Sequence, residues 1–129
     1  MIDVVAAIIE NDKKEILIAK RKLGKSQGGL WEFPGGKVEE GEKPEESLIR
    51  ELKEEMNIEI EVIKYFSENV HHYEKISIRL IAFKAIIISG EMELKDHEEY
   101  VWVQANKLKG FEFAPADICF VEKLIKLLK

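Results

Sequence analysis

Three glutamates at helical spacing are the residues of this sequence most suited to chemistry. Glu51, Glu54 and Glu55 are three and four positions apart, so their carboxylates share one face of an α-helix. Like charges this close destabilise a helix, and the helix dipole near a C-terminus also disfavours anions. A hard divalent cation would compensate, because Mg2+ binds carboxylates together with water and substrate phosphates. The spacing therefore predicts a metal site, with a solvated acidic face as the alternative interpretation.

These glutamates belong to a longer motif. It consists of Gly36, Glu42, Arg50, Glu51, Leu52, Glu54, Glu55, Asn57 and Ile58. The pattern resembles the Nudix box, which has a glycine where this chain has Asn57. Asparagine tolerates the left-handed backbone conformation that such a glycine provides, so we expect little loss of function from the exchange. Residues 19–21, 31–37 and 113–117 extend the resemblance, to MutT-type and CTP pyrophosphohydrolase members, over nearly the whole chain.

The resemblance implies both a fold and an activity. The fold is α/β (α+β), the Nudix α/β/α sandwich around a mixed β-sheet. The activity is Mg2+-dependent hydrolysis, with Mn2+ as a substitute, of a nucleoside triphosphate of the 8-oxo-dGTP or CTP/5-methyl-dCTP type. The products are the monophosphate and pyrophosphate, in nucleotide-pool sanitation and DNA repair. Such transfer depends mostly on positioning and charge neutralisation.

Two other functions stay open. One is a non-catalytic Nudix-fold nucleotide sensor, against which the complete set of box glutamates argues. The other is hydrolysis of another nucleoside diphosphate-linked substrate, such as ADP-ribose. Turnover of a substrate panel would separate all three.

The resemblance to the Nudix box implies a role for each residue that matches a position of the box. The residues that resemble metal ligands are Gly36, through its carbonyl, and the catalytic glutamates Glu51, Glu54 and Glu55. Arg50 resembles the box arginine that pairs with a glutamate of the same motif, which is a supporting role. We expect Glu42 to shape the loop before the helix.

Positions outside the box resemble phosphate contacts and a general base. Arg21 and Lys37 match positions that contact the polyphosphate in MutT-type enzymes, and arginine also binds phosphate in bidentate fashion. The base, or a further metal ligand, is expected from the loop at residues 95–99, where Asp96 and Glu98 are equivalent candidates. We interpret His97 of this loop as a surface residue.

The base-binding residues follow from the same resemblance. Asp117 stands where MutT-type enzymes use an amide to read the base. An ionised carboxylate only accepts hydrogen bonds, which suits the donors of guanine or cytosine, whereas a protonated one also donates. A helix N-cap is the alternative role for Asp117. We expect Phe33 to line the pocket or the core, Arg79 to touch the base, and His71 and His72 to lie in a loop.

Periodicity predicts the elements that carry these residues. The expected strands are 2–9, 15–20, 30–33, 58–66, 76–89 and 100–103, and the first two are expected to form a hairpin. A helix is expected to start at Pro44, to bury Leu48, Leu52 and Met56, and to end at Asn57 as a left-handed C-cap. A loop or helical turn is expected around 106–110. The second helix, 116–128, should bury Ile118, Val121, Leu124, Ile125 and Leu128.

Composition sets outer limits. With 129 residues, 46% hydrophobic, the sequence predicts one domain spanning 1–129. A net charge of −5 argues against binding long nucleic acid. The resemblance to the Nudix family implies a small nucleotide as the partner. The single Cys119 and the lack of a membrane-length apolar run favour a cytoplasmic protein without membrane contact. Both a monomer and a homodimer remain open.

Overall fold

The computed structural model describes residues 1–128. Its elements are β1 (Ile2–Ile9), β2 (Glu15–Arg21), β3 (Trp31–Glu32), β4 (Gly35–Lys37), α1 (Pro44–Met56), β5 (Ile58–His72), β6 (Ser77–Gly90), β7 (His97–Gln104), the 3-10 helices η1 (Ala105–Gly110) and η2 (Pro115–Asp117), and α2 (Ile118–Lys126). Within these residues, no helix combines the length and the apolar character that crossing a membrane requires.

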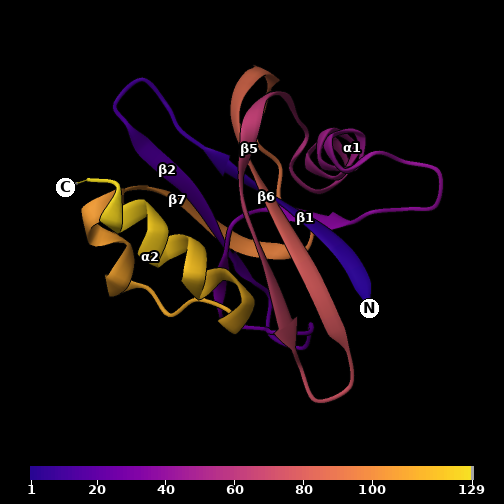
Figure 1. Cartoon of the computed structure of the whole chain (residues 1–129). Helices are drawn as coiled ribbons and strands as arrows, with labels where there is room; N and C mark the ends of the chain where they lie inside the picture. The colour runs from indigo at the N-terminus through magenta and orange to yellow at the C-terminus, as the bar shows by residue number, and fades with distance from the viewer. Residues whose placement is uncertain (129) are drawn as a thin grey trace.

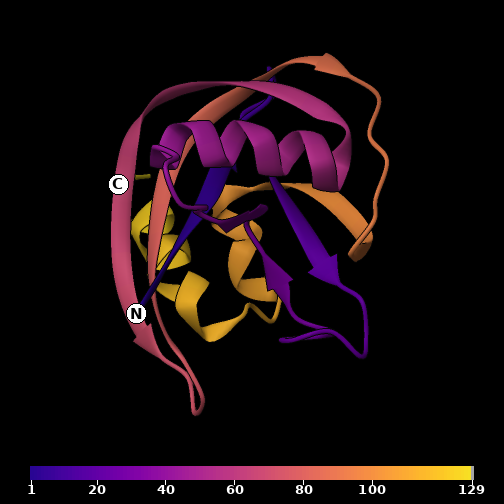
Figure 2. The same ribbon diagram turned by 90° about the vertical axis from the view of Figure 1, so that its right-hand side faces the viewer.

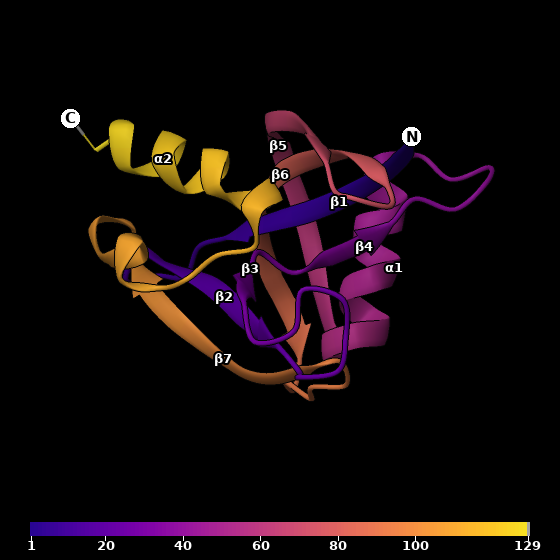
Figure 3. The ribbon, with the colours of Figure 1, turned by 90° about the horizontal axis from the view of Figure 1, so that it is seen from below.

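The strands form two sheets between two helices. One sheet has the order β4-β1-β6-β5 and the other β3-β2-β7. The β1–β6 pair is parallel and the other pairs are antiparallel, so the first sheet is mixed. Figures 1 and 3 show α1 and α2 on opposite sides of the strands. The expected sandwich around a mixed sheet is therefore confirmed.

The expected hairpin of the first two strands is wrong. β1 pairs with β4 and β6, whereas β2 pairs with β3 and β7. Between them, Glu10, just after β1, forms an isolated antiparallel bridge with Ile16 of β2. Both strands are continuous apolar runs that are buried on two faces, and such a run does not specify which neighbour it pairs with.

The core explains why these two strands are apolar throughout. Alternate residues of a strand point to opposite faces. Val5, Ala7 and Ile9 of β1 pack in the apolar layer under α1, while Ala6 and Ile8 pack in the layer under α2. The strands thus join two cores, which makes them a rigid base for the residues at their ends.

Helix α1 follows the expectation closely. It begins with Pro44 and buries Leu48, Leu52 and Met56, while Ile49 stays exposed. Asn57 has φ 58° and ψ 34°, the left-handed conformation in which glycine is usually found. Its amide Nδ2 also donates to the carbonyl oxygen of Glu91 at 3.0 Å. The asparagine therefore ends the helix as a glycine would.

Helix α2 differs in its start and in its buried face. Residues 115–117 form the turn η2, and α2 buries Phe120, Val121 and Leu124. Ile118 and Leu128, both expected in the core, are 45% and 58% exposed. The shorter helix is rotated relative to the predicted apolar stripe, because Phe120 replaces Ile118 at the interface.

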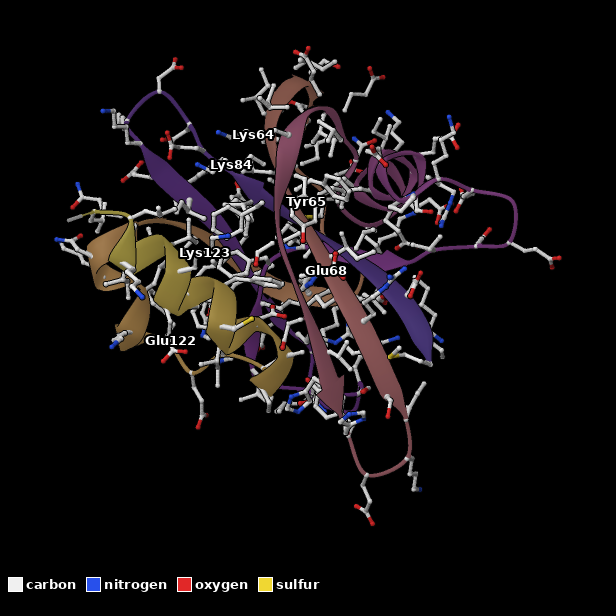
Figure 4. All side chains as sticks on the ribbon, in the orientation of Figure 1. Lys64, Tyr65, Glu68, Lys84, Glu122 and Lys123 are labelled. Carbon is white, nitrogen blue, oxygen red and sulfur yellow. The ribbon has the colours of Figure 1, made fainter. Side chains whose placement is uncertain are left out.

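A lysine ties α2 to the first sheet. The Lys123 ammonium donates to the Phe66 carbonyl oxygen at 2.9 Å and lies 4.8 Å from the centre of the Phe66 ring. Figure 4 shows Lys123 on the face of α2 turned toward β5, with Lys84 of β6 nearby. These contacts hold α2, and the η2 turn before it, against β5.

Strands β5 and β6 form a long curved hairpin, which Figure 2 shows arching over α1 and continuing beyond it. β5 has three irregularities in its register with β6, and irregularities of this kind bend a strand. His71 and His72, expected in a loop, instead end β5. The hairpin tip thereby brings Tyr73 and Ile76 to a cavity described below.

Candidate active site

The site begins where α1 crosses β4. Gly35 and Gly36 of β4 pair with Ala6 and Val5 of β1. A Cβ built at Gly35 would overlap the backbone of Val5, and one at Gly36 would overlap the Glu51 carboxylate. The Glu51 side chain therefore lies directly on the Gly36 backbone, where only glycine leaves room for it.

The close approach at Gly36 makes a specific prediction. Gly36→Ala should displace the Glu51 carboxylate and lower kcat/KM about 100-fold, since displacements of about 1 Å in an active site have effects of this size. Gly110→Ala is the matched control, because a Cβ at Gly110 meets no atom within 4 Å. Steady-state kinetics of both variants test the prediction, and equal activities would contradict the proposed role of Gly36.

Arg50 is the centre of an ion-pair network on α1. Its Nε and Nη2 donate to the two carboxylate oxygens of Glu42 at 2.8 and 3.0 Å, a bidentate pair. Its Nη1 donates to Glu51 at 2.9 Å and to Glu54 at 3.3 Å, and Nη2 also reaches the Lys37 carbonyl oxygen at 3.1 Å. This confirms the expected pairing of Arg50 with glutamates of its own motif.

Glu42 acts on the loop, as expected. Its carboxylate accepts hydrogen bonds from the Glu39 backbone and from the Ser47 hydroxyl at 3.1 and 2.7 Å. The hydrogen bonds from Arg50 and Ser47 lower the pKa of Glu42 to about 2. Glu42 is therefore ionised at neutral pH and holds the loop to the first turns of α1.

The surroundings of Glu51 and Glu55 disfavour the ionised form of their carboxyl groups. Burial raises the pKa of Glu51, although Arg50 opposes this shift. Burial, followed by the neighbouring Asp96 carboxylate, raises the pKa of Glu55. The Glu55 Oε2 atom is buried and has no hydrogen-bond partner within residues 1–128. Like charges and an unsatisfied oxygen are what a site for a cation presents before the cation binds.

These groups line one polar cavity. It has a volume of about 410 Å³ and is lined by Arg21, Gly35, Gly36, Lys37, Val38, Glu39, Glu51, Glu55, Asp96 and His97. The donors are carboxylate oxygens, with one imidazole and two cationic side chains beside them. This set fits a hard divalent cation that shares its coordination with phosphate oxygens.

The side chains expected as metal ligands do not all line this cavity. Among residues 1–128, no group of three His, Cys, Asp or Glu side chains converges as a ready metal cage. The Arg50 guanidinium holds both Glu51 and Glu54. Glu54 is 55% exposed and lies outside the lining of the cavity. Of the three glutamates expected as metal ligands, the structure brings Glu51 and Glu55 to the cavity.

The two candidate bases are placed differently. Asp96 lines the cavity, where the contacts with Glu55 and Lys25 lower the pKa of its carboxyl. Its carboxylate lies 3.2 Å from the Lys25 ammonium. Glu98 lies outside this lining and pairs with Lys20 at 3.4 Å. The structure therefore brings Asp96 to the site and leaves Glu98 outside.

The expectation for His97 is wrong. Its side chain is 2% exposed, and its Nε2 lies 2.8 Å from Glu32 Oε2. His97 is the first residue of β7, opposite Arg21 of β2, so the strand turns the ring inward. The polar residues around it in the sequence conceal this burial, which only the strand pairing specifies.

A second cavity opens beside the first. Its volume is about 420 Å³ and its lining is mostly apolar; besides Arg21, Gly35, Gly36 and Lys37 it includes Val4, Val5, Ser26, Gln27, Glu32, Phe33, Tyr73, Ile76, Ile78, Leu80, Ala114, Ala116 and Asp117. Arg21 and Lys37, both expected to contact phosphates, line both cavities. They thus lie at the junction of a carboxylate-lined cavity and an apolar one.

Asp117 lies deep in the apolar cavity. Its side chain is 5% exposed, and Oδ2 accepts a hydrogen bond from the Phe33 backbone N–H at 2.9 Å. Burial, and next the charge of Glu32, raise the pKa of Asp117 well above its usual range. Asp117 stands at the N-cap position of α2, but its side chain makes no capping hydrogen bond to that helix. Phe33 packs in the core and also lines the cavity.

The structure does not bring Arg79 to either cavity. Its guanidinium forms a bidentate pair with Asp3 at 3.1 and 2.7 Å. Its neighbours on β6, Ile78 and Leu80, do line the apolar cavity. Alternate residues of a strand face opposite ways, so Arg79 points to the other side of the sheet.

Comparisons with known proteins agree with this architecture. A model of the NUDIX domain family matches residues 2–124. The CTP pyrophosphohydrolase of Escherichia coli (strain K12) is 40% identical over 127 residues, covering 98% of this chain and 93% of that protein. The 8-oxo-dGTP diphosphatase of the same strain is 30% identical over 126 residues, covering 98% of each.

A solved structure is similarly close. The crystal structure of the MutT protein from Methanosarcina mazei Go1 has a TM-score of 0.87 to this chain at 30% identity, covering 99% of this chain and 95% of that one. The box spacing, the two adjoining cavities and these similarities all point the same way. The chain therefore belongs to the Nudix family, as a MutT-type hydrolase of acid anhydrides in phosphorus-containing substrates.

Proposed function

We propose that this protein hydrolyses a nucleoside triphosphate to the monophosphate and pyrophosphate in a Mg2+-dependent reaction, with Mn2+ as a substitute. One observation carries the proposal: a carboxylate-lined cavity and an apolar cavity adjoin, and both are lined by Arg21 and Lys37. A nucleotide has a matching division into charged phosphates and a flat, largely apolar base. Its polyphosphate would lie at the junction of the two cavities, beside the cationic side chains of Arg21 and Lys37.

Each residue of the site has a proposed role that follows from its chemistry. Arg21 and Lys37 neutralise phosphate oxygens, and Arg50 holds Glu51 on the Gly36 backbone. Glu51 and Glu55 would hold the divalent cation, with Glu54 joining once Arg50 releases it. When bound, such a cation polarises a phosphoryl oxygen and lowers the pKa of water. Asp96 is the proposed general base or further ligand, since it faces Glu55 inside the cavity.

Cytosine nucleotides are the first substrates to test. The E. coli CTP pyrophosphohydrolase supports them at 40% identity, and the E. coli 8-oxo-dGTP diphosphatase at 30% identity supports 8-oxo-dGTP as the second candidate. Asp117 suits either base. Its raised pKa favours the protonated acid, which can donate to a ring nitrogen or carbonyl as well as accept.

A turnover panel with Mg2+ tests the function. It contains the four canonical triphosphates, 8-oxo-dGTP, 5-methyl-dCTP, ADP-ribose and a dinucleoside polyphosphate, and it measures monophosphate and pyrophosphate. We expect pyrophosphate from CTP, 5-methyl-dCTP or 8-oxo-dGTP, and none after chelation of the metal. Hydrolysis of ADP-ribose alone would support the alternative substrate class. Binding of a triphosphate without turnover would support the nucleotide sensor.

Asp117→Asn tests the base contact within the same panel. The amide keeps an oxygen that can accept from the Phe33 N–H but cannot change protonation. We expect the kcat/KM ratio between CTP and 8-oxo-dGTP to change about 10-fold or more, and its dependence on pH to disappear. Asp12→Asn, in an exposed turn, is the control. An unchanged ratio would remove Asp117 from base recognition.

The proposal extends to the partner, the cellular role and the location of the protein. The partner is a small nucleotide, and the reaction removes damaged or surplus nucleotides before they enter nucleic acid. Cys119, which has no second cysteine in the sequence to pair with, supports a cytoplasmic location. A monomer and a homodimer are both compatible with a site built from one chain, and light scattering would distinguish them.

A further inference from the structure

A pair formed by a buried imidazole and a partly buried carboxylate joins the two cavities. His97 begins β7 and lines the polar cavity, while Glu32 ends β3 and lines the apolar one. Their side chains are 2% and 18% exposed, and His97 Nε2 lies 2.8 Å from Glu32 Oε2. His97 is buried and Glu32 is partly buried, so this short contact orients the imidazole, whose Nε2 would otherwise be left unsatisfied.

Arg21 completes the arrangement. β2 lies between β3 and β7. Glu32 is opposite Ala19 of β2 and His97 is opposite Arg21, two residues further along β2. The Arg21 Nη1 atom lies 3.6 Å from the same Glu32 oxygen that contacts His97. The Arg21 Nε atom donates to the Ser26 carbonyl oxygen at 2.7 Å.

The local backbone supports this placement. The register of β2 with β7 shifts between Lys20 and Arg21. Irregularities of this kind re-aim the side chain that follows and are common beside active sites. Lys22, next in the chain, donates its backbone N–H to the Asp96 carbonyl oxygen at 3.1 Å. The strand end is thus anchored on both sides of Arg21.

Hydrogen-bonding rules specify the direction of the contact. A carboxylate only accepts, so the Nε2–H of His97 donates to Glu32. The same Glu32 oxygen attracts the Arg21 guanidinium at ion-pair distance without taking a hydrogen bond from it. Among the described residues, the two terminal nitrogens of Arg21 make no hydrogen bond, so their N–H groups remain available for a ligand.

We infer that Glu32, fixed by His97, is a positioning residue that holds Arg21 at the junction of the two cavities, ready for the phosphates of the substrate. This inference rests on the proposed function and names two residues that do not themselves touch the reacting atoms. A charged side chain that is already oriented loses less conformational entropy when it binds. Glu32 and His97 should therefore act on the phosphates of the substrate through Arg21.

A double-mutant cycle tests that dependence. Glu32→Gln keeps an oxygen that can accept from His97 but removes the charge beside Arg21. We expect it to lower kcat/KM for the triphosphate about 10-fold alone and less than about 2-fold in an Arg21→Ala background. Glu99→Gln, an exposed change on the same strand as His97, should have no effect in either background. Equal losses from Glu32→Gln in both backgrounds would mean a merely structural role and would overturn the inference.

Variants of His97 provide a second, independent test of the role of Glu32. His97→Gln keeps an amide N–H donor for Glu32, whereas His97→Leu keeps the volume without a donor. We expect the leucine variant to lose as much kcat/KM as Glu32→Gln and the glutamine variant to retain most of it, at equal thermal stability. Equal losses in both variants would overturn the inference.

Binding separates this inference from the proposed function. Calorimetry with the α,β-methylene analogues of CTP and dGTP measures affinity without turnover, so the same cycle can be run on Kd. If the wild-type chain binds but does not hydrolyse, the proposed function fails while the cycle still decides the role of Glu32. If the wild-type chain binds neither analogue, both fail.

Discussion

Glu55→Gln is expected to lower kcat on the order of 10³-fold without loss of folding stability. The Glu55 carboxyl lines the polar cavity, faces Asp96 and has a buried oxygen without a partner among residues 1–128, so its charge serves a bound cation rather than the fold. Losing one ligand removes several kcal/mol of transition-state stabilisation, and about 1.4 kcal/mol corresponds to each factor of ten. Glu54→Gln should also lower turnover by orders of magnitude if Glu54 joins the cation in the working enzyme.

The expected stability of Glu55→Gln follows from the direction in which the pKa of Glu55 is shifted. The pKa of Glu55 is raised in the folded chain above its ordinary 4.5, so ionisation opposes folding. Without metal, stability should therefore rise as the pH falls from neutrality through the raised pKa toward 4.5. In Glu55→Gln this rise should be smaller, because the titrating group is absent. Thermal unfolding between pH 7 and 5, with and without Mg2+, measures both effects.

Glu45→Gln is the matched control for these variants. Glu45 is an exposed glutamate in the first turn of the same helix, α1. It should keep wild-type kcat and gain no stability from added Mg2+ beyond that of the wild-type chain. Full activity of Glu55→Gln, or a Mg2+ response equal to that of the wild type, would contradict the metal assignment.

Arg50→Lys is expected to destabilise the fold and to impair catalysis together. Lysine keeps the charge but cannot form the bidentate pair with Glu42 while also holding Glu51 and Glu54. Charge-assisted hydrogen bonds of this kind contribute about 1.5–3 kcal/mol each, so a loss of about 2 kcal/mol in the free energy of unfolding is expected. Because Glu51 would leave its place on Gly36, kcat should fall as well.

Urea unfolding and steady-state kinetics of Arg50→Lys measure these losses. Arg79→Lys is a suitable stability control, since Arg79 also forms a bidentate carboxylate pair, with Asp3, and its side chain is 41% exposed against 22% for Arg50. It should lose less stability. Wild-type stability and kcat in Arg50→Lys would show that the network has no positioning role.

The network also predicts how stability depends on pH. The Arg50 and Ser47 hydrogen bonds lower the pKa of Glu42 from the ordinary 4.5 to about 2. The stabilisation from this pair is therefore present above pH 4.5 and is lost as the pH falls from there toward 2. Arg50→Lys should lose less stability over that range than the wild-type chain does.

The local features of this protein could be predicted from its sequence. The spacing of the glutamates, Pro44 at the helix start and Asn57 at its end depend on contacts within a few residues, and the structure has them as predicted. Arg50 and Glu42 are of the same kind, because the loop and helix that carry them are continuous in sequence. The two apolar runs at residues 2–9 and 15–20 also specified buried strands.

The contacts between groups that are distant in the sequence could not be predicted in this way, because they depend on how the strands pair. The expected hairpin failed because strands buried on both faces can pair with several neighbours. Asp96 and Glu98 are chemically equivalent in the sequence, and only the path of the chain into β7 brings Asp96 to the cavity. His97 and Glu32 are 65 residues apart in the chain and meet because β2 lies between their strands. Helical spacing is a local property of the chain, whereas contact across a sheet requires the pairing of all its strands.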